Sequence, residues 1–253
     1  MAKATAVPVD VGAGVETGAL SPPDALPQLD ARRRGDNTAA VSDAFFMLAG
    51  MPQAGLGAKT LTVGVDEAGR GPLAGPVVAA AVVLCSPCVA GLADSKQLTP
   101  AERARLEPRI RRRCAFGIGV VEVEDIDRIN IFQATMWAMT MAVHRLVEAL
   151  GCEPDAILVD GNLTPHGRHA DWRWPARAIV GGDASERCIS AASILAKEHR
   201  DRLMRDYHRT HPHYGWERNM GYGTPEHLGA LREHGPSPYH RKSFAPVAQL
   251  QLI

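Results

Sequence analysis

The stretch Leu61-Thr62-Val63-Gly64-Val65-Asp66-Glu67 decides the fold, because it joins a β-rich run directly to two carboxylates. The run predicts a strand that ends at Asp66. The next apolar run, PVVAAAVVL from Pro76 to Leu84, is too continuous for a half-exposed strand. It therefore predicts a strand that is buried on both faces. These are the first two strands of the predicted sheet.

Strands and helices alternate along the rest of the chain. Thr99-Pro100-Ala101-Glu102 has Thr as N-cap, Pro at the first helical position and Glu at the third, which predicts a helix that runs toward Arg113. Further strands are predicted at Phe116–Glu122, Ala156–Val159 and Ala176–Val180, and further helices at Asn130–Leu150, Ser185–Tyr207 and from the Thr224 cap to Glu233. The pattern predicts a mixed α/β layer fold with a small helical C-terminal lobe.

Composition and charge narrow the class of protein. Residues 1–57 are rich in Ala, Gly, Pro and Asp without a sustained period, which predicts a disordered extension. The sequence has no secretory signal and no apolar run of membrane-spanning length, so we expect a cytoplasmic protein. Five scattered cysteines do not form a disulfide framework. The formal net charge is zero, so a nucleic-acid partner would have to be held by a local basic patch.

Carboxylates follow three of the predicted strands. Asp66 and Glu67 end the first strand, Asp160 ends the fourth, and Asp183 follows the fifth. Side chains at the ends of strands in one sheet converge on one edge, where α/β folds place their sites. Four carboxylates there would repel each other unless cations lay between them, and hard oxygen ligands suit Mg²⁺ or Mn²⁺. The alternative is that the acids lie in solvated turns, since Asp160-Gly161 is an ordinary turn pair.

A glycine-rich segment directly follows the first two acids. Gly69-Arg70-Gly71 places two glycines around an arginine. Glycines let the backbone approach a ligand closely, and their N–H groups can bond phosphate or hydroxyl oxygens. A tight turn is the alternative, because Gly71-Pro72 and Gly75-Pro76 are also turn signals.

These residues carry a resemblance to a known family. The stretch from Val65 to Val77, VDEAGRGPLAGPV, resembles the signature of the bacterial ribonuclease HII family. Matching motifs continue at suitable spacing from Leu61 to Val247: Asp94-Ser95-Lys96-Gln97-Leu98, Ile157-Leu158-Val159-Asp160-Gly161, Gly182-Asp183, Ile189 to Lys197 (ISAASILAK), Gly221-Tyr222-Gly223-Thr224 and His240-Arg241-Lys242-Ser243-Phe244.

The resemblance implies a fold, an activity and a set of site residues. The fold would be ribonuclease H-like, with a catalytic core at residues 58–208 and a substrate-binding lobe and tail at 209–253. The enzyme would be an endonuclease that cuts the RNA strand of RNA–DNA hybrids and cuts 5′ of ribonucleotides embedded in duplex DNA. Two metal ions would act, leaving a 3′-hydroxyl and a 5′-phosphate. We expect a monomer with no membrane contact.

The same resemblance assigns roles to named residues. The catalytic acids that bind Mg²⁺ or Mn²⁺ would be Asp66, Glu67, Asp160 and Asp183. Gly69, Arg70 and Gly71 would read the ribose 2′-hydroxyl, the group that distinguishes RNA from DNA. Tyr222 would stack on the sugar of the next deoxynucleotide, and Lys96 is a candidate phosphate contact.

Two features depart from the family pattern. Met220 stands before Gly221-Tyr222 where a basic residue is expected, which puts one backbone contact in doubt. The segment from Leu163 to Pro175, with Trp172 and Trp174, is longer than a minimal link between two strands and is interpreted as a surface loop.

Basic residues gather toward the C-terminus. Residues 197–242 hold nine Lys or Arg against six Asp or Glu, and seven of the ten histidines. The resemblance implies that these basic side chains grip the duplex backbone, including Arg200 and Arg241. The alternative is a solvated helix face with internal Arg–Asp pairs. The small residues Ser190 to Ser193 are interpreted as a site of close helix packing against the sheet.

Other motifs are set aside on geometry. Cys85-Ser86-Pro87-Cys88 has thioredoxin-like spacing but is not followed by the long helix that lowers a thiol pKa. As half of a zinc site it would need His166 and His169 from a distant loop. Gly55 to Thr60 lacks the Gly-Lys pair of a phosphate-binding loop. The rivals to the ribonuclease are a nuclease or resolvase that acts on DNA only and a non-catalytic hybrid-binding module.

Overall fold

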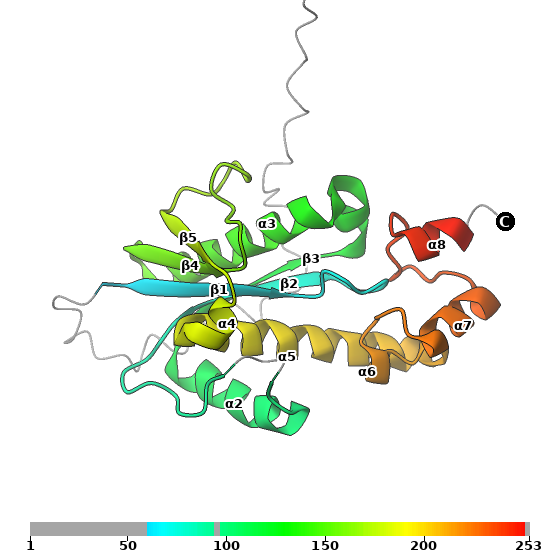
Figure 1. Cartoon of the computed structure of the whole chain (residues 1–253), viewed down its shortest axis with the longest axis horizontal. Coiled ribbons are helices and arrows are strands. Elements are labelled where there is room, and N and C mark those ends of the chain that lie inside the picture. The colour runs from blue at the N-terminus through cyan, green and yellow to red at the C-terminus, as the bar shows by residue number, and fades with distance from the viewer. Residues whose placement is uncertain (1–59, 94–96, 251–253) are drawn as a thin grey trace, which may run out of the picture. The chain divides into compact units, whose positions relative to one another are not determined.

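The computed structural model describes residues 60–93 and 97–250, and these residues form a five-stranded mixed sheet (Figure 1). Its strands are β1 (Thr62–Ala68), β2 (Val77–Val83), β3 (Ala115–Val121), β4 (Ala156–Asp160) and β5 (Ala176–Ile179). The order is β3-β2-β1-β4-β5. The first three strands pair antiparallel, whereas β1, β4 and β5 pair parallel. The predicted α/β class with a mixed sheet is confirmed.

Helices cover both faces of this sheet. Helix α3 (Val123–Leu150) lies on one face, and α2 (Pro100–Arg113) with α5 (Arg187–Thr210) lies on the other (Figure 1). Strand β2 is buried from both sides, with Val77 and Ala79 in the cluster under α3 and Val78 and Ala80 in the cluster under α2 and α5. Burying a valine side chain contributes about 1.5–3 kcal/mol, so this central strand anchors both layers. The prediction from its continuous apolar run is confirmed.

Glycines in the strands let the helices pack close to the sheet. A Cβ on Gly64 would lie 2.2 Å from the carbonyl carbon of Cys188 in α5. On the other face, a Cβ on Gly119 would lie 2.0 Å from the carbonyl oxygen of Ala138 in α3. Ser190 and Ser193 of α5 are buried directly above the sheet. The interpretation of the run from Ser190 to Ser193 as a site of close helix packing is confirmed. The two hydroxyls also form hydrogen bonds, Ser190 with the backbone of Asp183 and Ser193 with the side chain of Asp66.

Helix ends agree with the predicted caps except in α3. Thr99 forms a capping box with Glu102, and the Thr224 side chain accepts a hydrogen bond from the backbone N–H of His227. Helix α3 begins at Val123, earlier than the predicted Asn130. Asn130 has φ 69°, and its side chain accepts hydrogen bonds from the backbone N–H groups of Phe132 and Gln133. The predicted start at Asn130 is therefore a capped kink inside α3, and the sequence did not predict the helical residues that precede it.

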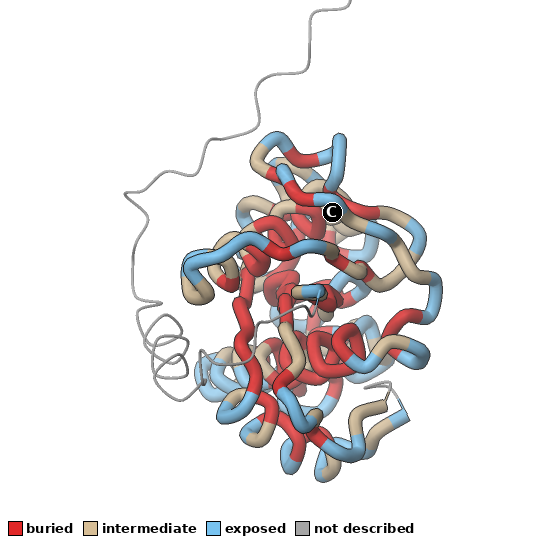
Figure 2. Tube along the Cα trace, turned by 90° about the vertical axis from the view of Figure 1, so that its left-hand side faces the viewer, coloured by how far each residue is buried: buried red, intermediate tan, exposed pale blue. Residues whose placement is uncertain are grey.

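The C-terminal elements pack around a third apolar cluster. They are η1 (Pro212–Tyr214), α6 (Trp216–Asn219), α7 (Pro225–His234) and α8 (Ala245–Leu250). Trp216 and Leu231 are fully buried there beside Leu73 and Ala74, which precede β2. Figure 2 shows that the buried residues of the fold gather in its interior and that exposed residues lie on the outer turns. The predicted boundary at residues 208 and 209 falls inside α5, and the division into core and lobe stays a prediction.

Three predictions from the sequence concern residues 1–57, Lys96 and the segment between β4 and β5. The disordered extension at residues 1–57 and Lys96 lie outside the described residues. The segment from Leu163 to Pro175 is more than a surface loop, because Trp172 and Trp174 are buried in the cluster under α3. The Trp172 indole donates to the backbone carbonyl of Trp174 (2.8 Å), and the Trp174 indole donates to Glu153. The interpretation as a surface loop was therefore wrong for its aromatic end.

Candidate active site

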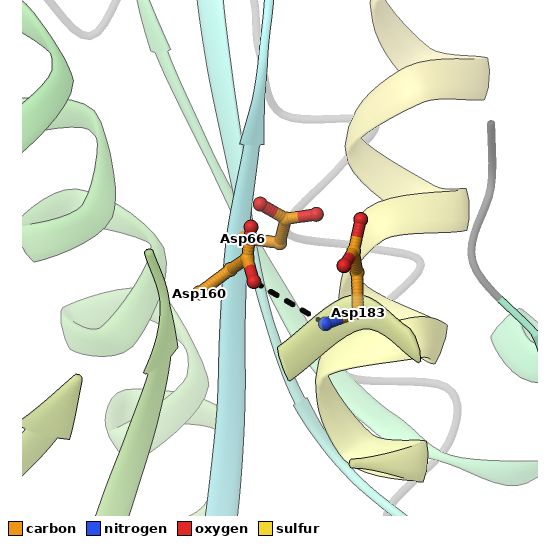
Figure 3. Close-up of side chains that lie close together, drawn as sticks. All are labelled: Asp66, Asp160 and Asp183. Atoms are coloured by element: carbon orange, nitrogen blue, oxygen red, sulfur yellow. Dashed lines mark hydrogen bonds between the residues drawn. The ribbon is translucent and has the colours of Figure 1, made fainter. Parts of the chain in front are cut away.

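The parallel pairing of β1 with β4 brings two of the predicted acids together. Val65 is paired with Val159, so Asp66 and Asp160 follow side by side at the ends of neighbouring strands. Asp183 comes from α4 (Gly182–Ser185), a short helix after β5. One carboxylate oxygen from each of Asp66, Asp160 and Asp183 lies within 4.8 Å of the others (Figure 3). Among the described residues, this is the one group of three or more potential metal ligands at such distances.

Backbone and hydroxyl groups hold the three aspartates in place. Asp160 Oδ1 accepts a hydrogen bond from the backbone N–H of Asp183 (3.3 Å), which links β4 to α4 (Figure 3). Asp66 Oδ1 accepts one from the backbone N–H of Glu67 (2.7 Å), and the Asp66 carboxyl group is also hydrogen-bonded to the Ser193 side chain. Ser190 Oγ donates to the carbonyl of Asp183 (2.6 Å). The two serines of α5 therefore support the site, a role that their small size alone did not indicate.

The acids repel each other in this arrangement. Asp66 and Asp183 are each only 4% exposed. Burial raises the pKa of Asp66 well above its usual value, and the neighbouring carboxylates of Glu67 and Asp160 raise it further. A bound cation would reverse both effects, because it favours the ionised carboxylates. Three hard oxygen donors of this kind fit Mg²⁺ or Mn²⁺.

Glu67 stands apart from the other three acids. Its carboxylate is not in the 4.8 Å group, and its Oε1 lies 3.4 Å from Nη1 of Arg70. Burial raises the pKa of Glu67, the Arg70 guanidinium acts against this, and Asp160 adds to the increase. The structure thus gathers three of the four predicted acids and places the fourth beside them, paired with an arginine.

The loop after Glu67 is held from beneath by two buried arginines. Gly69 has φ 97°, and a Cβ there would lie 2.1 Å from Nε of Arg200. Arg200 donates to the carbonyls of Ala74, Pro76 and Met220 at 2.9–3.0 Å. Arg241 donates to the carbonyls of Gly69, Arg70 and Gly75. Six backbone carbonyls therefore take the place of counter-ions.

Tyr222 lies beside this loop. A Cβ on Gly71 would be 3.6 Å from Cε1 of Tyr222, so the tyrosine ring flanks the second glycine. The backbone N–H of Leu73 donates to the carbonyl of Gly221 (2.8 Å), which joins the two segments. Tyr222 is 48% exposed, which is unusual for a large apolar ring. Loop and ring together form a continuous accessible surface next to the acids.

Comparisons with known proteins agree with this geometry. A family model for ribonuclease HII matches residues 63–247. Ribonuclease HII of Novosphingobium aromaticivorans is 71% identical over 195 residues, which cover 76% of this chain and 100% of that protein. Ribonuclease HII of Chlamydia pneumoniae is 48% identical over 197 residues, covering 77% of this chain and 87% of that protein. The chain belongs to the ribonuclease HII family.

Solved structures show the same fold. Ribonuclease H2 from Pyrococcus horikoshii aligns with a TM-score of 0.59 and 26% identity, covering 76% of this chain and 97% of that one. Bst-RNase HIII in complex with Mn²⁺ aligns with a TM-score of 0.64 and 21% identity, covering 76% of this chain and 70% of that one. The latter likeness concerns the fold alone.

Family membership settles the class of activity. This ribonuclease HII family member is an enzyme, a ribonuclease H hydrolase that acts on RNA–DNA hybrids, and the family depends on divalent metal. Within the described ranges, no helix combines the length and apolar character that a membrane crossing requires.

The expectation that Arg200 and Arg241 grip a duplex backbone is wrong. Arg200 is 1% exposed and Arg241 is 0% exposed, so neither can contact a duplex as expected. A count of charges along the chain could not separate these inward-facing arginines from exposed ones. Exposed basic side chains remain at Arg202, Arg205, Arg209, Arg218, Arg232 and Lys242.

The cysteine motif is not a redox helix. Cys85 and Cys88 are free thiols, and the described residues directly after Cys88 form no helix. Cys85 Sγ donates to the carbonyl of Pro87 (3.3 Å). Burial raises the pKa of the neighbouring Cys114 thiol to about 12, which keeps it protonated and unreactive.

Proposed function

We propose that this ribonuclease HII family member cuts on the 5′ side of a ribonucleotide embedded in duplex DNA, as well as within RNA–DNA hybrids. The products would carry a 3′-hydroxyl and a 5′-phosphate. One observation carries the proposal: the three carboxylates that fit a divalent cation lie next to a glycine-rich loop and an exposed tyrosine. Cleavage chemistry and ribose recognition would then share one surface.

The acids would hold the metal ions. Asp66, Asp160 and Asp183 are the ligands whose oxygens already converge, and Glu67 would complete the set. Two divalent cations, when bound, supply activation of a water molecule and charge stabilisation at the leaving 3′-oxygen. The chain contributes fixed positions: Asp160 is oriented by the backbone N–H of Asp183, and Asp66 by Ser193 and the N–H of Glu67. Mg²⁺ and Mn²⁺ both suit these oxygens.

The loop would distinguish ribose from deoxyribose. Arg241 occupies the carbonyls of Gly69 and Arg70, so the backbone groups that these two residues can offer a ligand are their N–H donors. Such donors can bond a 2′-hydroxyl, which deoxyribose lacks. Tyr222 would stack on the sugar of the following deoxynucleotide and so sense an RNA-to-DNA junction.

Exposed basic residues would hold the duplex. Arg205 is exposed on α5 and Arg232 on α7, and the exposed Lys242 follows them in the chain. Others are already paired, as Arg202 is with Glu107 (2.8 Å) and Arg209 with Asp206 (3.2 Å). Each phosphate contact releases a counter-ion, so affinity should fall steeply with salt. Lys96 stays a proposed phosphate contact.

A cleavage assay with matched duplexes tests the proposal. The substrates are a DNA duplex with one embedded ribonucleotide, the same duplex without it, and an RNA–DNA hybrid, each with Mg²⁺, with Mn²⁺ or with chelator. We expect metal-dependent cutting 5′ of the single ribonucleotide and none of the all-DNA duplex. Cutting of the hybrid alone would overturn the junction activity, and cutting of the DNA duplex would favour a DNA nuclease. Binding without cutting would favour a hybrid-binding module.

A further inference from the structure

Two buried histidines lie behind Tyr222. His227 in α7 and His240, which precedes Arg241, are both 0% exposed. Their Nε2 atoms are 3.0 Å apart, and His227 Nδ1 lies 2.9 Å from the carbonyl oxygen of Tyr222. Neither residue belongs to the acid group or to the glycine-rich loop. Their hydrogen bonds nevertheless connect with the backbone of the exposed tyrosine.

The partners of His227 define its tautomer. The indole Nε1–H of Trp216 can only donate, and it lies 3.1 Å from His227 Nε2. His227 Nε2 must therefore be an acceptor, which places the ring proton on Nδ1. The carbonyl of Tyr222 can only accept, so the Nδ1–H of His227 donates to it. The network assigns His227 as neutral with its proton directed at Tyr222.

The partners of His240 fit the same assignment. Its Nδ1 accepts from the backbone N–H of Ser237 (3.0 Å), so its proton is on Nε2. That Nε2–H donates to His227 Nε2, which is then shared by two donors. Burial lowers the pKa of His240 to about 3 and also lowers the pKa of His227, in keeping with two neutral rings.

The histidines also connect to the glycine-rich segment. The backbone of His240 forms a β-bridge with Ala74, and the N–H of Gly75 donates to the carbonyl of Tyr239 (2.8 Å). The chain of hydrogen bonds thus runs from the segment that follows Gly71, through His240 and His227, to Tyr222. The two sides of the accessible surface are held in register by these buried rings.

We propose that His227 is a positioning residue for Tyr222: its Nδ1–H, oriented by Trp216 and His240, fixes the Tyr222 carbonyl and so holds the ring against Gly71. The role rests on the proposed function, in which Tyr222 senses the junction. Losing this hydrogen bond should weaken junction recognition and leave the chemistry at the acids intact. The measured quantity is the junction preference, defined as kcat/KM for the embedded ribonucleotide divided by kcat/KM for an RNA–DNA hybrid.

Two substitutions separate positioning from packing. An Asn amide can replace the Nδ1–H donor of histidine, whereas a Gln amide reaches the Nε2 position. His227→Asn should therefore keep the bond to Tyr222, and His227→Gln should keep only the bonds to Trp216 and His240. We expect His227→Gln to lower the junction preference about fivefold to tenfold through KM, and His227→Asn to restore most of it. The opposite order, or an equal loss on both substrates, would overturn the proposal.

Two further measurements serve as controls. His144 in α3, whose Nε2 lies 3.1 Å from the carbonyl oxygen of Asp171, is a histidine with a similar hydrogen bond to a backbone carbonyl outside this network. His144→Gln should leave the junction preference unchanged. In a Tyr222→Ala background, His227→Gln should have no additional effect on the preference, because the ring it positions is gone. A full additional loss in that background would contradict the proposal.

The unmodified enzyme gives a test that does not depend on variant folding. Nitrogen-15 spectra of its histidine rings at neutral pH should show His227 as the Nδ1–H tautomer and His240 as the Nε2–H tautomer. The reverse assignment would overturn the proposal. If the unmodified enzyme shows no junction preference, the proposed function fails. If it shows the preference and His227→Gln retains it fully, only the positioning role fails.

Discussion

Two groups of buried charged side chains, one acidic and one basic, lie near the loop that follows Glu67. They differ in how their charges are compensated. Asp66, Asp160 and Asp183 gather their oxygens within 4.8 Å, and the pKa of Asp66 is raised by burial and by neighbouring acids. Arg200 and Arg241 are also buried, and burial lowers their pKa values to about 10 and about 9. Both arginines therefore stay charged at neutral pH.

The two groups differ in the source of the groups that compensate their buried charge. Six backbone carbonyls surround the two guanidinium groups, so their charge is stabilised entirely within the chain. The carboxylates have few donors of their own and gain most from an external cation. The charge of the arginine pair is thus compensated by the chain itself, whereas we propose that the acid group is completed by a bound cation. Substitutions at the acids and at the arginines therefore test the two sides of this contrast separately.

The largest effect is expected from replacing an acid of the site, and it should appear in the cleavage rate and not in stability. Asp160→Asn keeps the shape of the side chain but removes a charged ligand, so kcat should fall by about 10³-fold or more. Duplex binding and the melting temperature should stay close to those of the unmodified protein. Single-turnover cleavage with Mg²⁺, beside a filter-binding assay, measures both. A variant that cleaves within tenfold of the unmodified rate would remove Asp160 from the site.

At the arginines, stability should change together with recognition. A lysine cannot reach the three carbonyls that Arg241 bonds, so Arg241→Lys should lower the free energy of unfolding by about 2–3 kcal/mol. The melting temperature would then fall by roughly 4–12 °C, and discrimination between ribose and deoxyribose would weaken. The exposed Arg209 provides the matched control, because Arg209→Lys should change stability by less than about 0.5 kcal/mol. Equal melting temperatures for the two variants would contradict the internal role of Arg241.

Removing the charge of one buried acid should increase the stability of the metal-free protein. Since the raised pKa of Asp66 means that its ionised form is disfavoured in the folded state, Asp66→Asn should stabilise the metal-free protein by about 1–2 kcal/mol. Added Mg²⁺ should raise the melting temperature of the unmodified protein and have a smaller effect on the variant. Scanning calorimetry with chelator and with Mg²⁺ gives all four values. A variant less stable than the unmodified protein in chelator would show that the acids are compensated without metal.

The smallest effect is expected in the pH dependence of stability, through His240, which precedes Arg241 in the chain. His240 has a pKa of about 3 when folded and an ordinary value near 6.5 when unfolded, so the unfolded state binds more protons between these values. Its contribution to stability is complete above about pH 6.5 and is lost as the pH falls toward 3. His240→Gln should therefore lose about 0.7 kcal/mol less stability than the unmodified protein between pH 7 and pH 6. Comparing the two proteins cancels the opposite trend from Asp66 and Glu67; parallel curves would contradict the assignment.

Local patterns determined much of this protein. The β-rich run to Val65, the continuous apolar run of β2 and the caps at Thr99 and Thr224 are set by neighbouring residues, so sequence alone predicted those elements. The placement of acids after strands also predicted a common edge. The parallel pairing of Val65 with Val159 explains why Asp66 and Asp160 meet there. Their metal-binding and catalytic roles stay predictions.

Tertiary structure decided what depends on facing direction and on distant partners. Glu67 pairs with Arg70 instead of joining the other acids, and Arg200 and Arg241 turn inward although their sequence context is that of surface cations. Asn130 caps an internal kink, and Trp172 and Trp174 fill the core beneath α3. Each outcome depends on contacts between residues far apart in the chain, such as Arg241 with Gly69. A local pattern fixes the type of element, but only the packed fold decides which groups a side chain meets.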